Sequence, residues 1–384
     1  MPLKSKSFNR ERVYTLSLAH LSHDTFSSFL APLLPLLIEK LGMSLFMSAF
    51  LDIARRIPSL FNPFFGLIAE KRGAKYFVIL TPAITAISMS LIGMVNSYAI
   101  LLILLIVAGI SSALFHVPSP TMIKESSGEK VGRGMSFFMV GGELARTLGP
   151  LLVLSAVSWW GLEGIYRLMP IGILASLILY WKLKDFDIQR PLTRAKNRPK
   201  IKKLFQNYYP FFIAIGLLIM AQSGMKSALS FYLPVYLVQE GESLWYAGIS
   251  LSILQFFGVL GTFLSGSISD KIGRKQMLLI ASVSSIIFMG LFIWSGNIII
   301  LAFLGLSIFA TNPVLLAWVQ DTSSGMPTFM NSIYMSINFG VSSLMVFVVG
   351  YLGDGYGLKS TYIITTFIAL LAIPMISLLS RHHR

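Results

Sequence analysis

Twelve apolar stretches, each about as long as a membrane-spanning helix, follow one another along the 384-residue chain. A hydrocarbon layer about 30 Å thick is crossed by roughly 20 helical residues, and backbone polar groups in lipid must be satisfied within the helix. The sequence therefore predicts an all-α polytopic membrane protein with 12 transmembrane helices. They are expected at 12–38, 44–69, 76–95, 98–123, 134–157, 164–182, 208–238, 244–269, 276–294, 297–319, 329–352 and 360–380.

Composition agrees with a chain solvated by lipid. Hydrophobic residues make up 55% and charged residues 12% of the sequence, which is too little polar surface for a soluble protein of this length. The net charge of +15 does not indicate nucleic acid as a partner, because the basic residues lie between the apolar stretches. Without cysteine, the chain has no disulfide, zinc–thiolate site or cysteine nucleophile.

Two short charged segments resemble each other: Gly66–Lys75 reads GLIAEKRGAK, and Gly266–Lys275 reads GSISDKIGRK. Each lies between two apolar stretches, and corresponding loops in two halves indicate an internal duplication. The sequence thus predicts two six-helix pseudo-repeats. An N-terminal bundle is expected at 1–182, a basic cytoplasmic linker at 183–207 and a C-terminal bundle at 208–384.

The repeated loop also predicts a gate. Glu70 and Asp270 each end a helix, where a carboxylate can cap a neighbouring helix or pair with Arg72 or Arg274. Such contacts would hold one conformation shut and would break in another. The residues expected in this role are Gly66, Glu70, Arg72, Gly73, Lys75, Gly266, Asp270, Gly273, Arg274 and Lys275.

Lysine and arginine between the predicted spans are strongly concentrated on one side of the membrane. By the positive-inside rule, both termini and the basic linker are cytoplasmic. The first apolar stretch is longer than a signal-peptide core and no small-residue cleavage site follows it, so we expect no cleaved signal peptide. The expected location is the cell (inner) membrane, crossed many times.

Seven charged residues lie within the predicted spans and away from their ends. Each costs about 2.5–3.5 kcal/mol at the bilayer centre, so these side chains are expected to face the bundle interior or a watery cavity. With all seven ionised the set carries a net charge of about +1, which favours an anionic or zwitterionic ligand. The alternative is that the close pairs only lock helices together. The seven are Asp24, Asp52, Arg55, Arg56, Glu143, Arg146 and Lys226.

Asp24 is the first candidate for proton coupling. His20 and His23 lie within one helical turn of it, and a carboxylate among histidines in a poorly hydrated cavity can load and release a proton near neutral pH. A carboxylate permanently paired with a basic residue is the alternative. His116, beside two prolines that interrupt the fourth span, and Glu143 complete the proton-coupling candidates.

Uncharged polar and aromatic side chains of the second half are candidates for substrate binding, because apolar walls with sparse polar groups suit amphiphiles. Many of them could equally serve as interhelical hydrogen bonds. Together with the charged groups, the substrate-binding candidates are Asp52, Arg55, Arg56, Arg146, Lys226, Gln222, Tyr232, Gln255, Asn312, Trp318 and Asn338.

Enzymatic function finds no support in the sequence. There is no phosphate-binding Gly-x-x-x-x-Gly-Lys-Ser/Thr segment and no His-Glu-x-x-His helix. We therefore expect neither an enzyme nor a cofactor or metal.

The two loops and the twelve spans around a basic linker resemble the major facilitator superfamily. Three segments are similar to its fosmidomycin-resistance group of drug exporters: 17–24 (SLAHLSHD), 111–116 (SSALFH) and 140–150, with Gly141, Gly142 and Gly149-Pro150. The resemblance implies a proton-driven antiporter that expels amphiphilic or phosphonate-like compounds by alternating access. The chain departs from the group at Glu143, where an amide would be expected, and in its Asp52-Arg55-Arg56 cluster.

These observations predict a secondary active transporter that exports an anionic or zwitterionic amphiphile, such as an antibiotic, in exchange for protons. Uptake of an anionic metabolite by symport or facilitation is the first alternative, and a non-transporting membrane scaffold or sensor is the second. The expected partners are a small-molecule substrate, protons and the bilayer, with the protein a monomer.

Overall fold

The computed structural model describes residues 8–62, 65, 74–186, 201–322 and 327–379. Within these ranges the secondary structure is helical, with no strand. Contacts divide the chain into two compact units. The first unit holds Met1–Met43 and Phe50–Leu192, and the second holds Ser44–Ala49 and Thr193–Arg384.

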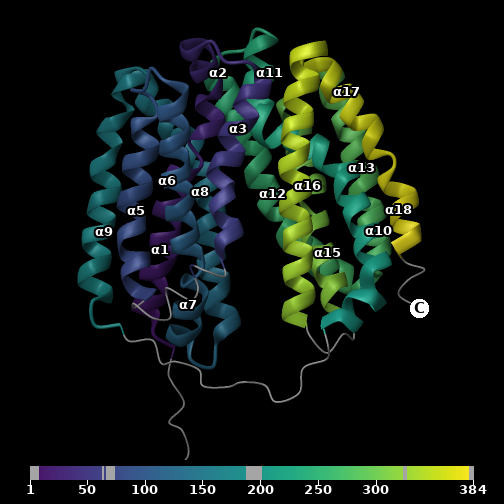
Figure 1. Ribbon diagram of the computed structural model, residues 1–384, viewed down its shortest axis with the longest axis horizontal. Coiled ribbons are helices and arrows are strands. Elements are labelled where there is room, and N and C mark those ends of the chain that lie inside the picture. Colours follow the sequence, from purple (N-terminus) through teal and green to yellow (C-terminus); the bar gives the residue numbers. More distant parts are fainter. Residues whose placement is uncertain (1–7, 63–64, 66–73, 187–200, 323–326, 380–384) are drawn as a thin grey trace, which may run out of the picture. The chain divides into compact units, whose positions relative to one another are not determined.

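Helices of the first unit appear in purple to teal in Figure 1. The first turns of α3 are grouped with the second unit. In chain order the helices are α1 (Arg10–Ser27), α2 (Leu30–Leu41), α3 (Leu45–Arg56), η1 (Ile57–Phe61), α5 (Ala74–Leu91), α6 (Tyr98–His116), α7 (Ser119–Ser127), α8 (Val131–Trp160), η2 (Glu163–Leu168) and α9 (Met169–Leu183).

Helices of the second unit appear in teal to yellow in Figure 1. They are α10 (Ile201–Ser227), η3 (Ala228–Tyr232), α11 (Leu233–Gln239), α12 (Leu244–Ile272), α13 (Arg274–Ser295), α14 (Ile298–Phe309), α15 (Thr311–Gln320), α16 (Pro327–Tyr356), α17 (Leu358–Ala369) and α18 (Ala372–Leu379).

Ten helical stretches in the described ranges are long and apolar enough to cross a membrane, judged by length and composition. The apolar part of α5, Lys75–Leu91, is shorter. The predicted span at 44–69 begins in α3, and most of its end lies outside the described residues. Large apolar side chains such as Trp181 and Trp294 are more than 70% exposed, as expected for surfaces that face lipid rather than water.

Helix packing in the first unit centres on α1, which lies along α8 and also contacts α5. Close approach is possible because glycine replaces larger residues on α8: a Cβ added at Gly141 would stand 2.3 Å from the Ser17 carbonyl oxygen of α1. A buried core of aliphatic and aromatic residues, which includes Phe115 and Phe138, fills the space between these helices. Polar side chains that enter this region are therefore held in fixed positions.

Candidate functional site

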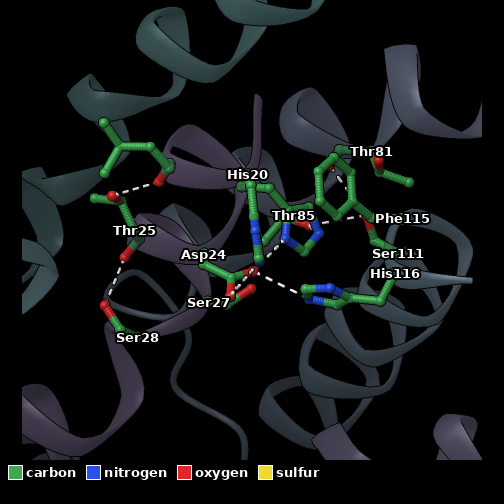
Figure 2. Close-up of polar contacts among 12 residues, drawn as sticks. His20, Asp24, Thr25, Ser27, Ser28, Thr81, Thr85, Ser111, Phe115 and His116 are labelled. Carbon is green, nitrogen blue, oxygen red and sulfur yellow. Dashed lines mark hydrogen bonds and ion pairs between the residues drawn. The ribbon is translucent and has the colours of Figure 1, made fainter. Parts of the chain in front are cut away.

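Three histidine side chains of the first unit meet around one carboxylate, that of Asp24 (Figure 2). Asp24 lies within 3.3 Å of His20, 2.9 Å of His23 and 3.2 Å of His116. We call these four residues the histidine–aspartate cluster. The structure thus brings together four of the five residues predicted for proton coupling. None of the ion pairs that Asp24 makes within the described ranges involves lysine or arginine.

The cluster follows from the local sequence. His20 and Asp24 stand four residues apart on α1, so both project from one face. His116 is the last residue of α6, because Pro118 and Pro120 end that helix and begin α7. Gly142 of α8 leaves room for an imidazole: an added Cβ would stand 2.3 Å from the His20 ring.

A directed chain of hydrogen bonds fixes the proton of His23. The Ser111 hydroxyl donates to the Thr81 carbonyl oxygen at 3.0 Å, which can only accept. Ser111 must therefore accept from the Thr85 hydroxyl, at 2.8 Å. The single hydroxyl proton of Thr85 is then used, so His23 Nε2, 3.0 Å from Thr85 Oγ1, is the donor in that contact.

This direction has a consequence at Asp24. If His23 is neutral with its proton on Nε2, then Nδ1 carries a lone pair and faces Asp24 Oδ1 at 2.9 Å. Two lone pairs do not form a hydrogen bond, so a further proton must lie between these atoms. The pair is either imidazolium with carboxylate or neutral imidazole with carboxylic acid.

His20 repeats the arrangement on the other carboxylate oxygen. Its Nδ1 lies 2.8 Å from the Phe138 carbonyl oxygen, so Nδ1 carries the proton and Nε2 faces Asp24 Oδ2 at 3.3 Å. A second added proton would turn this longer contact into a hydrogen bond as well. The side chain of His23 is fully buried, whereas that of His116 is 38% exposed, which makes His116 the most open route for protons to the carboxylate.

The same spacing bears on metal binding. Ligand atoms of His20, Asp24 and His116 all lie within 4.8 Å of one another, close enough in principle to share a metal ion. The contact between His23 and Asp24 requires a proton in either case, since its two atoms face each other directly at 2.9 Å. The need for a proton at this contact is therefore the same whether or not a metal ion is bound by the other three residues.

The predicted charge cluster on α3 forms a compact trio. Asp52 is 1% exposed and lies 3.1 Å from Arg55 Nη2 and 2.8 Å from Arg56 Nε. Arg55 also reaches the Ser27 carbonyl oxygen, at 3.4 Å, three residues beyond Asp24 on α1. The trio carries a net positive charge beside the histidine–aspartate cluster.

Glu143, the fifth proton-coupling candidate, is on α8 and lies apart from the cluster, whose members belong to α1 and α6. It pairs with Arg146 at 3.3 Å, and the Arg146 side chain is 51% exposed. Its contacts do not join it to the histidine–aspartate cluster within the described ranges.

Four of the predicted substrate-binding residues line one cleft of the second unit: Gln222, Lys226, Asn312 and Asn338. The other three in this unit lie outside its lining, and their role in binding stays a prediction. Tyr232 is buried and donates a hydrogen bond to the Leu45 carbonyl oxygen at 2.9 Å. Trp318 belongs to the apolar core, and Gln255 is half-buried on α12.

Of the two predicted gating loops, the structure describes the second and Lys75 of the first. Arg274 pairs with Asp270 at 2.5 Å and with Asp321 at 3.0 Å, and so ties the ends of α12 and α15 to the start of α13. Gly273 allows this turn with a φ of 96°. Lys75 donates to the Lys184 carbonyl oxygen. Gly66, Glu70, Arg72 and Gly73 lie outside the described residues, as does linker segment 187–200.

Sequence reasoning missed the hydrogen-bond chain formed by the Thr85 and Ser111 hydroxyls and the Thr81 carbonyl oxygen. It also missed Asp354, whose carboxylate accepts hydrogen bonds from the backbone N–H groups of Leu45 and Phe46 at 2.8 and 2.9 Å. Spacing offered one weak signal, since Thr81 and Thr85 stand four residues apart in an apolar helix.

Comparisons with known proteins agree with this architecture. Residues 16–344 match the family profile described as Major Facilitator Superfamily. The chain is 25% identical to the fosmidomycin resistance protein of Escherichia coli (strain K12), with 96% of this chain and 93% of that protein covered. It is 25% identical to the multi-drug resistance efflux pump PmrA of Streptococcus pneumoniae, with 68% and 67% covered.

A solved structure shares the fold. A bacterial homolog of the human lysosomal transporter Spinster, in an inward-facing and unoccupied conformation, superimposes with a TM-score of 0.75 at 16% sequence identity. The match covers 99% of this chain and 98% of that one.

Proposed function

Because the chain belongs to the major facilitator superfamily, we propose that this multi-pass membrane protein is a proton-coupled exporter of amphiphilic small molecules with an anionic or zwitterionic group. Family membership and fold make it a transporter rather than an enzyme. To membership of this transporter family we add three assignments: the proton as the coupling ion, export as the direction, and amphiphiles with an anionic or zwitterionic group as the substrates.

The contact between His23 and Asp24 carries the proton part of the proposal. A buried carboxylate that needs an extra proton to satisfy its neighbour is a site that gains and loses a proton as its access to water changes. His116, the most exposed member of the cluster, is the group through which the proton enters and leaves.

Export is supported by similarity to proteins named for drug resistance. In such an exchanger, protons moving down their gradient drive the substrate the opposite way, provided that both use one conformational cycle. The cell (inner) membrane, where a proton gradient is maintained, is the location that this function requires.

Flux into proteoliposomes tests the proposal, with fosmidomycin and a panel of amphiphilic phosphonates as probes. An antiporter accumulates the probe when the lumen is made acidic. Asp24→Asn removes the ionisable oxygen pair with little change of volume and should abolish accumulation driven by pH, while probe exchange without a gradient persists. Glu242→Gln, an exposed carboxylate in a loop, is the matched control and should behave as the parent.

Two results would contradict the proton assignment. One is accumulation by Asp24→Asn equal to that of the parent. The other is loss of pH-driven accumulation in the parent when EDTA is present, which would assign the cluster to a metal ion instead.

A second function, uptake of an anion together with a proton, is favoured by one observation. Arg55 reaches the Ser27 carbonyl oxygen near Asp24. An anion held at Arg55 and a proton held at Asp24 attract each other, so their binding would be mutually favourable. A symporter of this kind accumulates the probe when the outside is acidic, and the sign of the effective gradient therefore separates the two functions.

A further inference from the structure

Three members of the histidine–aspartate cluster direct ligand atoms into one small space. His20, Asp24 and His116 each offer one such atom, and these atoms all lie within 4.8 Å of one another. His20 and Asp24 belong to α1, and His116 is the last residue of α6. Two imidazole nitrogens and a carboxylate oxygen are a donor set that zinc and similar divalent transition metals prefer. The residues thus have the chemistry of a metal site.

The distances within this set fit a tetrahedral ion. Ligand atoms about 2.0–2.2 Å from zinc lie about 3.3–3.6 Å from each other when the ion is tetrahedral. His20 Nε2 lies 3.3 Å from Asp24 Oδ2, and His116 Nε2 lies 3.2 Å from Asp24 Oδ1. One carboxylate therefore holds both imidazole nitrogens near the separations that a shared ion requires.

The backbone of α8 orients His20 for metal binding. His20 Nδ1 donates to the Phe138 carbonyl oxygen at 2.8 Å, so the neutral ring has its lone pair on Nε2, which faces Asp24. Metal-binding histidines almost always have this arrangement, in which the second ring nitrogen donates to a carbonyl, a carboxylate or water. The Phe138 ring also stacks on the His20 ring, with centroids 4.1 Å apart. Both contacts hold the lone pair toward the shared space.

The charges around the cluster are compatible with a bound cation. When the proton between His23 and Asp24 is on His23, Asp24 remains a carboxylate and keeps its negative charge for an ion. Arg55 is a nearby positive group, but it pairs with Asp52 Oδ1 at 3.1 Å, which reduces its repulsion of a second cation. The carboxylate is thus available as an anionic ligand.

His116 provides access for the ion. Its side chain is 38% exposed, whereas those of His20 and Asp24 are 6% and 8% exposed. A hydrated ion can therefore bind His116 first and exchange its water for the two buried ligands. Three protein ligands leave one position of a tetrahedral zinc ion for water.

We propose that His20, Asp24 and His116 bind one divalent transition-metal ion of the zinc type, and that the bound ion inhibits transport. Binding follows from the geometry alone. Inhibition rests on the proposed function, because the ion occupies the carboxylate that carries the coupling proton. Mg²⁺ and Ca²⁺ should not bind, since both prefer a shell made of oxygen ligands.

Calorimetry with zinc chloride on the purified full chain in phosphatidylcholine nanodiscs tests binding, with any affinity tag removed and no proton gradient. His382→Asn and His383→Asn are present in every sample, because two neighbouring histidines near the chain end can bind zinc themselves. This chain should bind one Zn²⁺ and no Mg²⁺. Asp24→Asn and His116→Gln should each weaken Zn²⁺ binding at least tenfold.

Glu163→Gln is the matched control, because it replaces a 72% exposed carboxylate by an amide away from the cluster, and it should leave the affinity for Zn²⁺ unchanged. Co²⁺ adds a readout that a change of stability does not reproduce. Bound Co²⁺ should give the visible absorption of a tetrahedral site, and His116→Gln should lose this band while it keeps the melting temperature of the chain with an intact cluster.

Two results would overturn the site: no saturable Zn²⁺ binding, or equal affinity in Asp24→Asn, His116→Gln and the intact cluster. In proteoliposomes Zn²⁺ should reduce pH-driven flux and EDTA should restore it, and unchanged flux with Zn²⁺ bound would overturn the inhibition. Zinc binding without pH-driven flux in any sample would contradict the proposed function alone. Flux driven by pH without zinc binding would contradict this inference alone.

Discussion

Among single residues, Thr85 decides where the proton of the histidine–aspartate cluster lies. Its hydroxyl proton goes to Ser111, so its oxygen accepts from His23 and holds that ring in the tautomer that lacks a proton toward Asp24. The requirement for an added proton is therefore imposed by a residue that does not titrate.

Replacing Thr85 by valine removes this requirement. His23 can then place its proton on Nδ1 and donate to the Asp24 carboxylate, so the cluster is satisfied with one proton fewer. One hydrogen bond contributes about 0.5–1.5 kcal/mol, so the pH of half-maximal flux should fall by about 0.5–1 unit. The measurement is the pH profile of probe flux in proteoliposomes.

Thr85→Ser keeps the hydroxyl and should leave the profile within error of the parent. A Thr85→Val profile that coincides with the parent, or that moves to higher pH, would show that Thr85 does not set the direction of the chain. Loss of stability alone would lower the amplitude without moving the midpoint.

The sequence was sufficient to identify His20, His23, Asp24 and His116 as candidates, because charged and imidazole groups are rare in apolar helices. It was not sufficient to assign Thr85 or Ser111. Serine and threonine in helices commonly donate to a carbonyl of their own helix, as Ser88 and Ser155 do here, so the four-residue spacing of Thr81 and Thr85 is only a weak sign of contacts with a neighbouring helix.

Among the elements, α3 begins with a cap supplied from elsewhere in the chain. The carboxylate of Asp354, near the end of α16, accepts from the first two backbone N–H groups of α3, where a negative charge is also favoured by the helix dipole. Tyr232 donates to the Leu45 carbonyl oxygen in the same turn. The start of α3 is thus fixed by two long-range contacts.

Removing this cap should destabilise the protein. Asp354→Ala leaves two N–H groups without their acceptor and should cost about 0.5–2 kcal/mol, the range measured for helix caps. Asp354→Asn keeps one side-chain oxygen as an acceptor and should cost less. The measurement is the midpoint of thermal unfolding in detergent, followed by intrinsic fluorescence.

Glu240→Gln is the control for this prediction, since it breaks an exposed ion pair with Lys359 that is worth about 0–1 kcal/mol. We expect the midpoint to fall most for Asp354→Ala, less for Asp354→Asn and least for Glu240→Gln. An unchanged midpoint in Asp354→Ala would mean that water replaces the cap at no cost.

The length of each apolar stretch predicted where most long helices lie, because a segment must be long and apolar enough to remain in lipid. The interruption near Pro118 was also expected from the two prolines. Other breaks, between α1 and α2 at Ser28 and between α14 and α15 at Ala310, come four and three residues before Pro32 and Pro313. Proline lacks the N–H that would bond the carbonyl four residues earlier, so these breaks also have a signal in the sequence, which the predicted continuous spans at 12–38 and 297–319 did not use.

For the whole molecule, the predicted two-bundle organisation and its orientation in the membrane rest on the repeated loops and on the distribution of basic residues. The second loop forms an ion-pair network around Arg274, whereas most of the first lies outside the described residues. A gate built from both loops therefore stays a prediction, and so does the cytoplasmic position of the termini.

Orientation can be measured directly because the natural chain has no cysteine, so each introduced thiol is the sole target for a maleimide. Thr193→Cys lies in the basic linker, and Glu242→Cys lies in the short loop between α11 and α12. If basic loops are retained in the cytoplasm, an impermeant maleimide should label Glu242→Cys on intact cells and Thr193→Cys only after permeabilisation. The parent sets the background, and the reverse pattern would place the linker outside and invert the direction assigned to transport.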